Sequence, residues 1–475
     1  MRQLSEHQDI RAEIRRIWDL QKKKRWPLAQ STVAERRARL KRLRAAIEKH
    51  RDAINEAVRK DFGKAPEEVD ITETHLVMEE LGLTLRSLAD WMRPEPVNTP
   101  LLLAGTSSEV RPEARGHVLV LGPFNYPFQL AVTPVLYAVA AGNVVVVKPS
   151  EKTPATSAMV RTVLAEAFPE DEVAVVDGDG AAAEALLELP WDHIFFTGST
   201  TVGKKVMAAA ARHLSGVTLE LGGKSPAVID RSAQLDWAAR TLVWGKFINA
   251  GQTCIAPDYV LVAEEQRDAL VERLKTAVTD SYGPDPKASP DFCRIIDDKA
   301  FSRLRGSIDS AVRSGARVAF GGDSDPATRY LAPTVLVDVP ADSEVMREEI
   351  FGPVLPVLTY RTLEEAVEFI RARPHPLALY VFARKRNARE QVLEGTASGG
   401  ACINTSVLHF ANPELPFGGI GPSGLGNYHG RAGFRCFSHE RGVLRQRGRP
   451  LSLLLAPPYK GRMNRLTARI ARWLE

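Results

Sequence analysis

Cysteine is scarce in this chain of 475 residues, which has only Cys254, Cys293, Cys402 and Cys436. These four form no close pair and no spacing typical of metal ligands, so the sequence predicts neither a disulfide scaffold nor a metal site. Free thiols persist in a reducing compartment. We therefore expect a cytoplasmic protein in which one cysteine can stay reactive.

Long apolar runs and a strong excess of one charge are also missing. No stretch of about 20 apolar residues is present, and the polar N-terminus does not look like a signal peptide. The net charge of +5 is mild and indicates no nucleic-acid partner. Basic residues do gather between positions 36 and 44, but Leu40, Leu43 and Ile47 interleave with them at helical spacing, which favours a solvated helix face.

The pattern along the chain predicts an α/β fold with more than one domain. Residues 6–92 are rich in helix formers, and the proline-rich segment 94–100 ends that region. Short apolar runs then alternate with Ala-rich helical segments, which is typical of a doubly wound parallel sheet that binds ligands at the C-terminal ends of its strands. The five predicted strands are residues 117–121, 143–148, 172–177, 193–197 and 217–221.

A second alternating region predicts a second α/β domain, with strands at 226–229, 259–263, 316–320, 334–339, 379–383 and 401–404. Two outlying segments, 108–115 and 434–438, are expected to pair as a small bridging ribbon. We assign residues 1–107 and 116–221 to a cofactor domain, 222–432 to a catalytic domain, 108–115 and 433–445 to the ribbon, and 446–475 to a tail.

The tail has its own pattern. Met463, Leu466, Ile470 and Leu474 fall at helical spacing with arginines off that stripe, which predicts a basic amphipathic helix. Docking on the protein or on a partner subunit is favoured over attachment to a membrane surface.

Three residues could carry covalent chemistry. Cys254 follows Gly251-Gln252-Thr253, although a lone cysteine is more often a small buried apolar residue. Glu220 ends the fifth predicted strand and is a candidate general base, or else an ion-pair partner. Asn125 follows the first strand and could donate to an oxyanion, or could cap a helix expected to open at Tyr126.

Two further segments could bind a nucleotide. Gly198 to Gly203 follows a strand and opens a helix whose N–H groups can hold a phosphate, although it matches neither the G-x-G-x-x-G nor the P-loop pattern. Lys148 and Glu151, at the end of the second strand, could hydrogen-bond the ribose of an adenine nucleotide. Glu151 would favour an unphosphorylated 2′-hydroxyl.

Taken together and in this order, the motifs resemble the aldehyde dehydrogenase family over roughly residues 30–445. The matching segments are 123–127, 148–151, 196–203, 220–226, 251–254, 348–353 and 415–426. The ending from Leu415 to Gly430 looks like the class 3 branch, which includes fatty, aromatic and coniferyl aldehyde dehydrogenases.

The resemblance implies roles for residues at matching positions. Cys254 would be the nucleophile, Glu220 the general base and Asn125 the oxyanion donor. The cofactor, NAD with NADP also usable, would be held by Lys148, Glu151, Gly198, Ser199, Gly203, Glu349 and Phe351. The walls of the aldehyde tunnel are expected to include Phe124, Tyr126, Phe128, His409 and Phe410, which suggests an apolar or aromatic substrate. Phe124 stands where class 3 members often have Trp, so the tunnel mouth is expected to differ.

The implied reaction oxidises an aldehyde to a carboxylate through a thioester on Cys254, in a protein that is typically a homodimer. Two alternatives stay open. A coenzyme-A-acylating dehydrogenase would release the acyl group to a thiol, but Glu220 argues against it because only water needs a base. A non-enzymatic binding protein on the same fold is the other, and the presence of Cys254, Glu220 and Asn125 argues against it.

Overall fold

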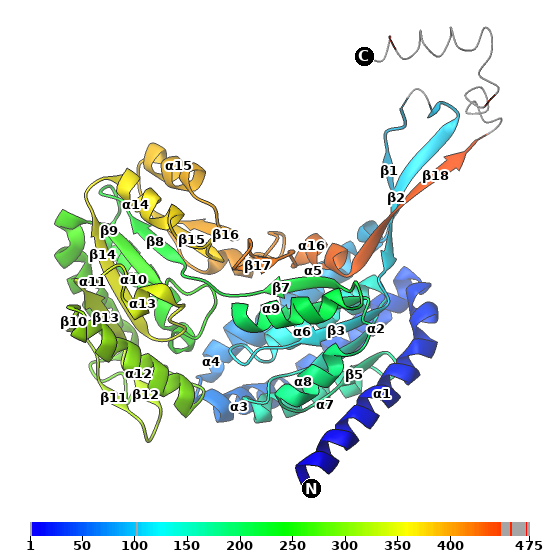
Figure 1. Ribbon diagram of the computed structural model, residues 1–475, viewed down its shortest axis with the longest axis horizontal. Helices are drawn as coiled ribbons and strands as arrows, with labels where there is room; N and C mark the ends of the chain where they lie inside the picture. The colour runs from blue at the N-terminus through cyan, green and yellow to red at the C-terminus, as the bar shows by residue number, and fades with distance from the viewer. Residues whose placement is uncertain (1, 101–102, 448–456, 458–471, 473–475) are drawn as a thin grey trace.

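The computed structural model describes residues 2–100, 103–447, 457 and 472, and shows two α/β lobes with a ribbon that projects from one of them (Figure 1). The N-terminal region is helical, as predicted. Its elements are α1 (Arg2–Ala29), α2 (Val33–Lys49), α3 (Arg51–Phe62), α4 (Pro66–Val69), the π-helix η1 (Asp70–Thr74) and α5 (His75–Trp91). The helix predicted for the C-terminal tail lies outside the described residues.

The first lobe contains a six-stranded sheet in the order β17-β7-β6-β3-β4-β5. Five of its strands are parallel, and β3, β4, β5 and β6 are buried along their whole length, which is typical of a sheet covered by helices on both faces. They confirm the predicted doubly wound sheet. The elements are β3 (His117–Leu121), α6 (Gln129–Ala141), β4 (Val144–Lys148), α7 (Pro154–Ala167), β5 (Val173–Val175), α8 (Gly180–Leu187), β6 (His193–Thr197), α9 (Thr200–Ala211) and β7 (Gly216–Glu220).

The chain returns to this first sheet near its end. Strand β17 (Gly424–Leu425) pairs antiparallel with β7, and Gly424 stands opposite Glu220. The return therefore comes before residue 432, where we placed the end of the catalytic domain.

The second lobe contains a seven-stranded sheet in the order β10-β13-β14-β9-β8-β15-β16. Six of these strands were predicted; the missed one, β14 (Val354–Tyr360), contains Pro356, which has no N–H to donate and so weakens the strand pattern. The other strands are β8 (Pro226–Ile229), β9 (Tyr259–Ala263), β10 (Arg317–Phe320), β13 (Thr334–Val337), β15 (Ala378–Phe382) and β16 (Gly400–Ile403). The helices of eight or more residues are α10 (Leu235–Phe247), α11 (Arg267–Tyr282), α12 (Asp298–Arg313), α14 (Leu363–Arg371) and α15 (Arg386–Gly395).

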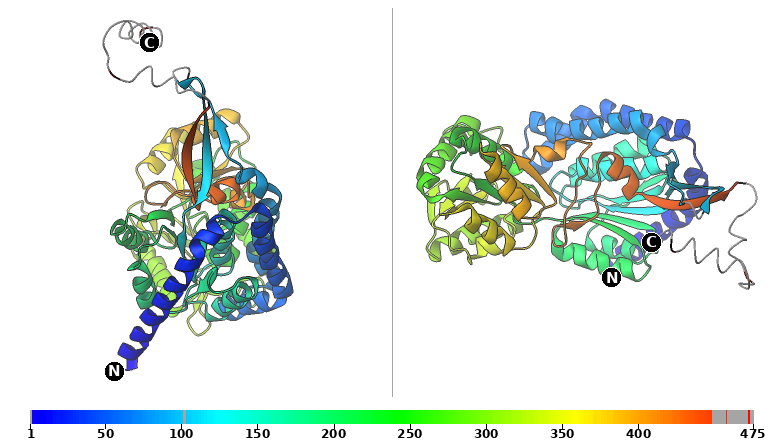
Figure 2. Two further views of the ribbon diagram at one scale, coloured as in Figure 1. Left: turned by 90° about the vertical axis from the view of Figure 1, so that its right-hand side faces the viewer. Right: turned by 90° about the horizontal axis from the view of Figure 1, so that it is seen from above.

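The ribbon differs from its prediction in two strands, since β1 (Glu95–Val97) was not predicted and the last strand lies elsewhere. It consists of β1, β2 (Thr106–Ala114) and β18 (Ser438–Gln446), with Ser438 opposite Ala114 and Gln446 opposite Thr106. The predicted strand 434–438 is wrong, because Phe434 belongs to helix α16 (Gly430–Cys436). Strand β18 is mostly polar and exposed, so no apolar alternation marks it in the sequence. Figures 1 and 2 show the ribbon standing away from both lobes.

Candidate active site

The turn that carries Cys254 has an unusual backbone. It follows α10 as a short 3-10 segment, Ile248–Gly251, in which Asn249 and Ala250 have φ of 52° and 49°. Left-handed backbone is disfavoured for residues other than glycine and persists only where the surroundings enforce it. The Asn249 amide donates to the Asn125 carbonyl at 2.8 Å and to the Gln252 carbonyl at 3.1 Å. These bonds hold the turn in one shape.

Further contacts join this turn to other segments of the second lobe. The Gln252 side-chain amide donates to the carbonyls of Asn249 and Arg294, each at 3.1 Å. Gly251 has φ of 74°, and a Cβ placed there would collide with the Gly352 carbonyl. The turn therefore packs backbone to backbone against the segment that carries Glu349 and Phe351.

Two carboxylates influence the Cys254 thiol. Burial, followed by the charges of Glu349 and Glu220, raises the pKa of Cys254 well above its ordinary value. The thiol is therefore protonated in this state, and a nearby positive charge or a base is needed to form the thiolate.

Glu220 is buried at the end of β7. Among the described residues, neither of its carboxylate oxygens has a hydrogen-bond partner. Burial raises the pKa of Glu220 well above its ordinary value. A buried carboxyl group with both oxygens free and a raised pKa is typical of a functional acid or base rather than of a structural ion pair.

Glu349 is a second unsatisfied carboxyl group. Its Oε1 has no partner among the described residues, and a Cβ at Gly222 would collide with its carboxylate. Burial, with help from the charge of Asp258, raises the pKa of Glu349 to about 8. Gly222 thus leaves room for this carboxylate beside Leu221, just past the end of β7.

The turn that carries Asn125 contacts the nucleophile turn. Helix α6 begins at Gln129 rather than at Tyr126, and its N-cap is Phe128, so the buried Asn125 is not the helix cap. The Asn125 carbonyl accepts from Asn249, and the Tyr126 hydroxyl lies 2.7 Å from the Thr253 hydroxyl. The structure therefore brings the predicted oxyanion donor and the predicted nucleophile onto adjoining turns.

The predicted nucleotide residues lie at the C-terminal ends of β4 and β6. Ser199 caps α9 by accepting from the Val202 N–H at 3.4 Å. A Cβ at Gly203 would lie 2.7 Å from Leu221, and one at Gly198 would lie 2.5 Å from the Phe196 ring. Lys148 pairs with Glu151 at 2.9 Å. A helix start that requires glycine beside a Lys–Glu pair fits the pyrophosphate and ribose of a dinucleotide.

An apolar cavity of about 150 Å³ reaches Cys254. Tyr126 and Phe410, which we expected in the tunnel walls, are among the residues that line it. Its lining residues are Ile71, Thr72, Leu76, Tyr126, Gln129, Leu130, Trp244, Ile248, Thr253, Cys254, Ile255, Val407, Leu408, Phe410 and Ala411. The sequence did not predict that Ile71, Thr72 and Leu76 line the cavity. Helical periodicity shows which face of a helix is apolar, but not which distant segment that helix packs against.

The other three predicted wall residues lie elsewhere. Phe128 is fully buried in the core. Phe124 packs edge to face on Phe351, with ring centroids 5.6 Å apart, next to Lys152. His409 turns its Nδ1 toward the Cys402 sulfur at 3.2 Å. None of the three is among the residues that line this cavity, because aromatic type alone does not determine which cavity a side chain faces.

Two classes of feature are missing from the described part of the chain. Residues 2–100 and 103–447 contain no helix long and apolar enough to cross a bilayer. They also contain no group of three or more His, Cys, Asp or Glu side chains that could hold a metal ion.

Comparison with known proteins is consistent with this geometry. The sequence profile of the aldehyde dehydrogenase family matches residues 4–443. The 4,4′-diaponeurosporen-aldehyde dehydrogenase of Staphylococcus aureus is 42% identical over 92% of this chain and 94% of its own length. The dimeric NADP-preferring aldehyde dehydrogenase of Rattus norvegicus is 45% identical over 85% of this chain and 88% of its own.

A solved structure agrees with the sequence matches. The substrate-bound state of Staphylococcus aureus AldH superposes with a TM-score of 0.92 and 40% identity, covering 96% of this chain and 99% of that one. The chain belongs to the aldehyde dehydrogenase family.

Proposed function

We propose that this NAD(P)-dependent aldehyde dehydrogenase oxidises apolar aldehydes to carboxylic acids, with Cys254 as nucleophile and Glu220 as general base. The observation that carries the proposal is the position of Cys254 at an apolar cavity, within the electrostatic influence of the buried Glu220 and the partly buried Glu349. A cavity of this kind admits the aldehyde and excludes most of the water that would compete with the thiol.

The chemistry follows from these positions. Glu220 takes the proton of the Cys254 thiol and passes it to water, and the sulfur attacks the aldehyde carbon. The Asn125 amide and the Cys254 backbone N–H donate to the resulting oxyanion. Loss of one such donor costs about 2.7–4 kcal/mol. NAD or NADP, when bound, supplies the hydride acceptor. Hydride loss from the former aldehyde carbon leaves a thioester, and Glu220 takes a proton from the water that hydrolyses it, which releases the acid and the thiol.

The cavity supports an apolar substrate class. Its walls are almost entirely aliphatic or aromatic, and Ile71, Trp244 and Leu408 expose 60%, 39% and 48% of their surfaces around it. An apolar tail longer than the cavity could lie over these side chains. The relative from Staphylococcus aureus, named for a diaponeurosporene aldehyde, agrees with this choice.

The test combines one variant with a substrate series. Cys254→Ala should abolish NADH formation with hexanal, hexadecanal, benzaldehyde and coniferaldehyde while cofactor binding stays measurable. Cys436→Ala is the matched control, because Cys436 is a partly buried cysteine outside the cavity. Normal turnover by Cys254→Ala would remove the nucleophile assignment, and equal kcat/KM for polar short-chain aldehydes would remove the apolar substrate class.

Two alternatives are separated by the same assay. Acid formation without coenzyme A excludes the acylating reaction, and the free oxygens of Glu220 favour water as the acceptor. The absence of NADH formation with every aldehyde would favour a non-enzymatic binding protein.

We also propose NAD as the preferred cofactor, a homodimer and a cytoplasmic location. Partial burial would raise the pKa of Glu151, but backbone N–H and Lys148 hydrogen bonds outweigh it and lower that pKa, so the carboxylate is charged. A charged Glu151 repels a 2′-phosphate, although NADP stays usable, as in the rat relative's name. Within the described part of the chain, β18 pairs with β2 on one side only, and such an edge strand suits pairing with a second subunit.

A further inference from the structure

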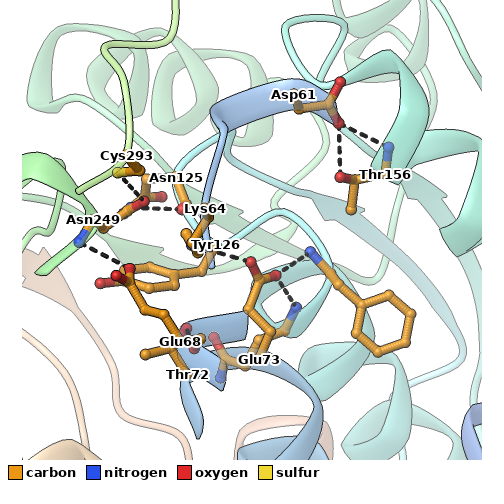
Figure 3. A network of polar contacts seen from close by, with 12 residues as sticks. Asp61, Lys64, Glu68, Thr72, Glu73, Asn125, Tyr126, Thr156, Asn249 and Cys293 are labelled. Carbon is orange, nitrogen blue, oxygen red and sulfur yellow. Dashed lines mark hydrogen bonds and ion pairs between the residues drawn. The ribbon is translucent and has the colours of Figure 1, made fainter. Parts of the chain in front are cut away.

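A charged cluster in the N-terminal helical region, with two fully buried members and one partly buried member, faces both catalytic turns (Figure 3). It consists of Lys64, Glu68 and Glu73, and we refer to it as the Lys64 cluster. Lys64 and Glu73 are fully buried and paired at 3.3 Å. The Lys64 ammonium also lies 4.5 Å from the centroid of the Tyr126 ring. Burial of charges costs free energy of folding, so a cluster of two carboxylates and one cation points to a functional role.

Glu73 holds the turn of Asn125. Its Oε2 accepts from the backbone N–H groups of Phe128 at 2.8 Å and Gln129 at 3.3 Å. These are N–H groups at the start of α6, which have no partner inside the helix. Glu73 therefore fixes the point where the Asn125 turn enters the helix.

Glu68 holds the turn of Cys254. Its Oε1 accepts from the backbone N–H of Asn249 at 2.9 Å, which is the first left-handed residue of that turn. Burial raises the pKa of Glu68, while Lys64 and the Asn249 N–H act against that rise. This hydrogen bond joins the turn to the N-terminal region, whereas those to the carbonyls of Gln252 and Arg294 stay within the catalytic lobe.

The π-helix explains how both carboxylates reach the same place. Glu68 lies in α4, two residues before η1 (Asp70–Thr74) begins, and Glu73 lies within η1, five residues further along the chain. Residues five apart are out of phase in an α-helix, but the i→i+5 bonding of a π-helix brings them to one face. The same segment turns Ile71 and Thr72 into the aldehyde cavity. One local distortion thus serves the cavity wall and both catalytic turns.

We propose that Glu68 is a positioning residue, whose carboxylate holds the left-handed turn at Asn249 so that Cys254 faces the aldehyde cavity. Lys64 balances the charges of Glu68 and Glu73 and so joins the two catalytic turns through one cation. The inference rests on the proposed role of Cys254. It predicts that loss of the Glu68 acceptor slows the reaction of the sulfur without weakening binding of aldehyde or cofactor.

The test uses three variants of the full-length protein. Glu68→Ala removes the acceptor, Glu68→Gln keeps an oxygen that can accept from Asn249, and Glu67→Gln is the control because the neighbouring Glu67 is exposed. Glu68→Ala should lower kcat by about tenfold or more with both KM values within about twofold, since a displacement of about 1 Å can cost about 100-fold. Glu68→Gln should recover most of the rate, and Glu67→Gln should match the wild type.

A second readout does not depend on aldehyde turnover. Alkylation of Cys254 by iodoacetamide, followed by intact mass with Cys254→Ala as the blank, should slow in Glu68→Ala and recover in Glu68→Gln. If the wild type oxidises no aldehyde, the proposed function fails while this comparison still tests the position of the sulfur. Wild-type kcat and alkylation in Glu68→Ala would overturn the inference. Equal losses in Glu68→Ala and Glu68→Gln, or parallel losses of kcat, cofactor affinity and Tm, would overturn it as well.

Discussion

At the scale of single residues, the site gathers groups that a stable core would avoid. Glu220 and Lys246 are buried and Glu349 is partly buried, and each has at least one buried polar atom with no hydrogen-bond partner among the described residues. Each such group costs free energy of folding unless a ligand or water satisfies it. Their presence within one neighbourhood indicates that the site is built for chemistry at the expense of stability.

Replacement of Glu220 by Gln should separate the two halves of the reaction. Deacylation should fall by about 100-fold or more, because a general base contributes about 10²–10⁴-fold. The acyl-enzyme should then accumulate, and intact mass spectrometry would detect it after a burst of NADH. In the wild type, deacylation should rise with pH as the carboxyl group, whose pKa is raised by burial, ionises. Wild-type turnover without an acyl-enzyme would contradict the assignment.

Lys246 should make the stability of the fold depend on pH. Burial lowers its pKa to about 8, although Asp258 acts against this. The folded protein thus binds fewer protons than the unfolded chain between about pH 8 and pH 10.5, and the stability contributed by this group rises across that window. Lys246→Met should raise Tm more at pH 7 than at pH 10, with a gain of about 1–3 kcal/mol at the lower pH. The exposed Lys275→Met is the control, and a gain independent of pH would contradict the prediction.

At the scale of elements, the turn Ile248–Gly251 decides where the nucleophile lies. Its left-handed residues belong to neither a helix nor a strand, so the periodicity of apolar residues could not predict the shape of the turn. The same limit applies to η1 and to β18, which carry no regular apolar spacing. In contrast, β3, β8 and β9 begin and end where the sequence predicts, because each is a fully buried apolar run between turn residues.

A pair of glycine variants tests the packing of this turn. Gly251 and Gly283 have φ of 74° and 78°, but only a Cβ at Gly251 would collide with another backbone segment. Both Gly251→Ala and Gly283→Ala should lose some stability, of order 1–3 kcal/mol from the backbone alone. Only Gly251→Ala should also lose activity, by about tenfold or more, because Gly352 would be displaced beside Glu349. Thermal melting and kcat/KM measure the two effects. Equal activity in the two variants would show that the close approach is not needed.

At the scale of the whole molecule, the ribbon projects away from the lobes, and contacts within one chain do not account for this exposed position. Leu444 exposes 53% of its surface on the open edge strand β18. Leu444→Glu should shift a dimer toward a monomer in light scattering at micromolar concentration, because a charge in a subunit contact is costly. Leu214→Glu, at the most exposed large apolar residue, is the control and should leave the dimer intact. A monomeric wild type would overturn the proposed dimer.

The sequence alone determined the chemistry that this protein can attempt. Buried strand runs indicated the parallel sheet, and the short motifs around Asn125, Glu220 and Cys254 indicated the family, because chemistry depends on residue type and on position at strand ends. The resemblance also implied that Glu349 and Phe351 contact the cofactor, which stays a prediction.

Only the tertiary structure decided how these residues meet. Cys254 gains its setting from Glu220 in the other lobe and from Glu349, 95 positions along the chain, and its turn is bonded to Glu68 across 181 positions of sequence. The cavity wall at Ile71 and the exclusion of Phe128 from it follow from the same packing. A local pattern gives the period of an element, whereas contacts between distant segments depend on which faces pack together, and no local pattern contains that information.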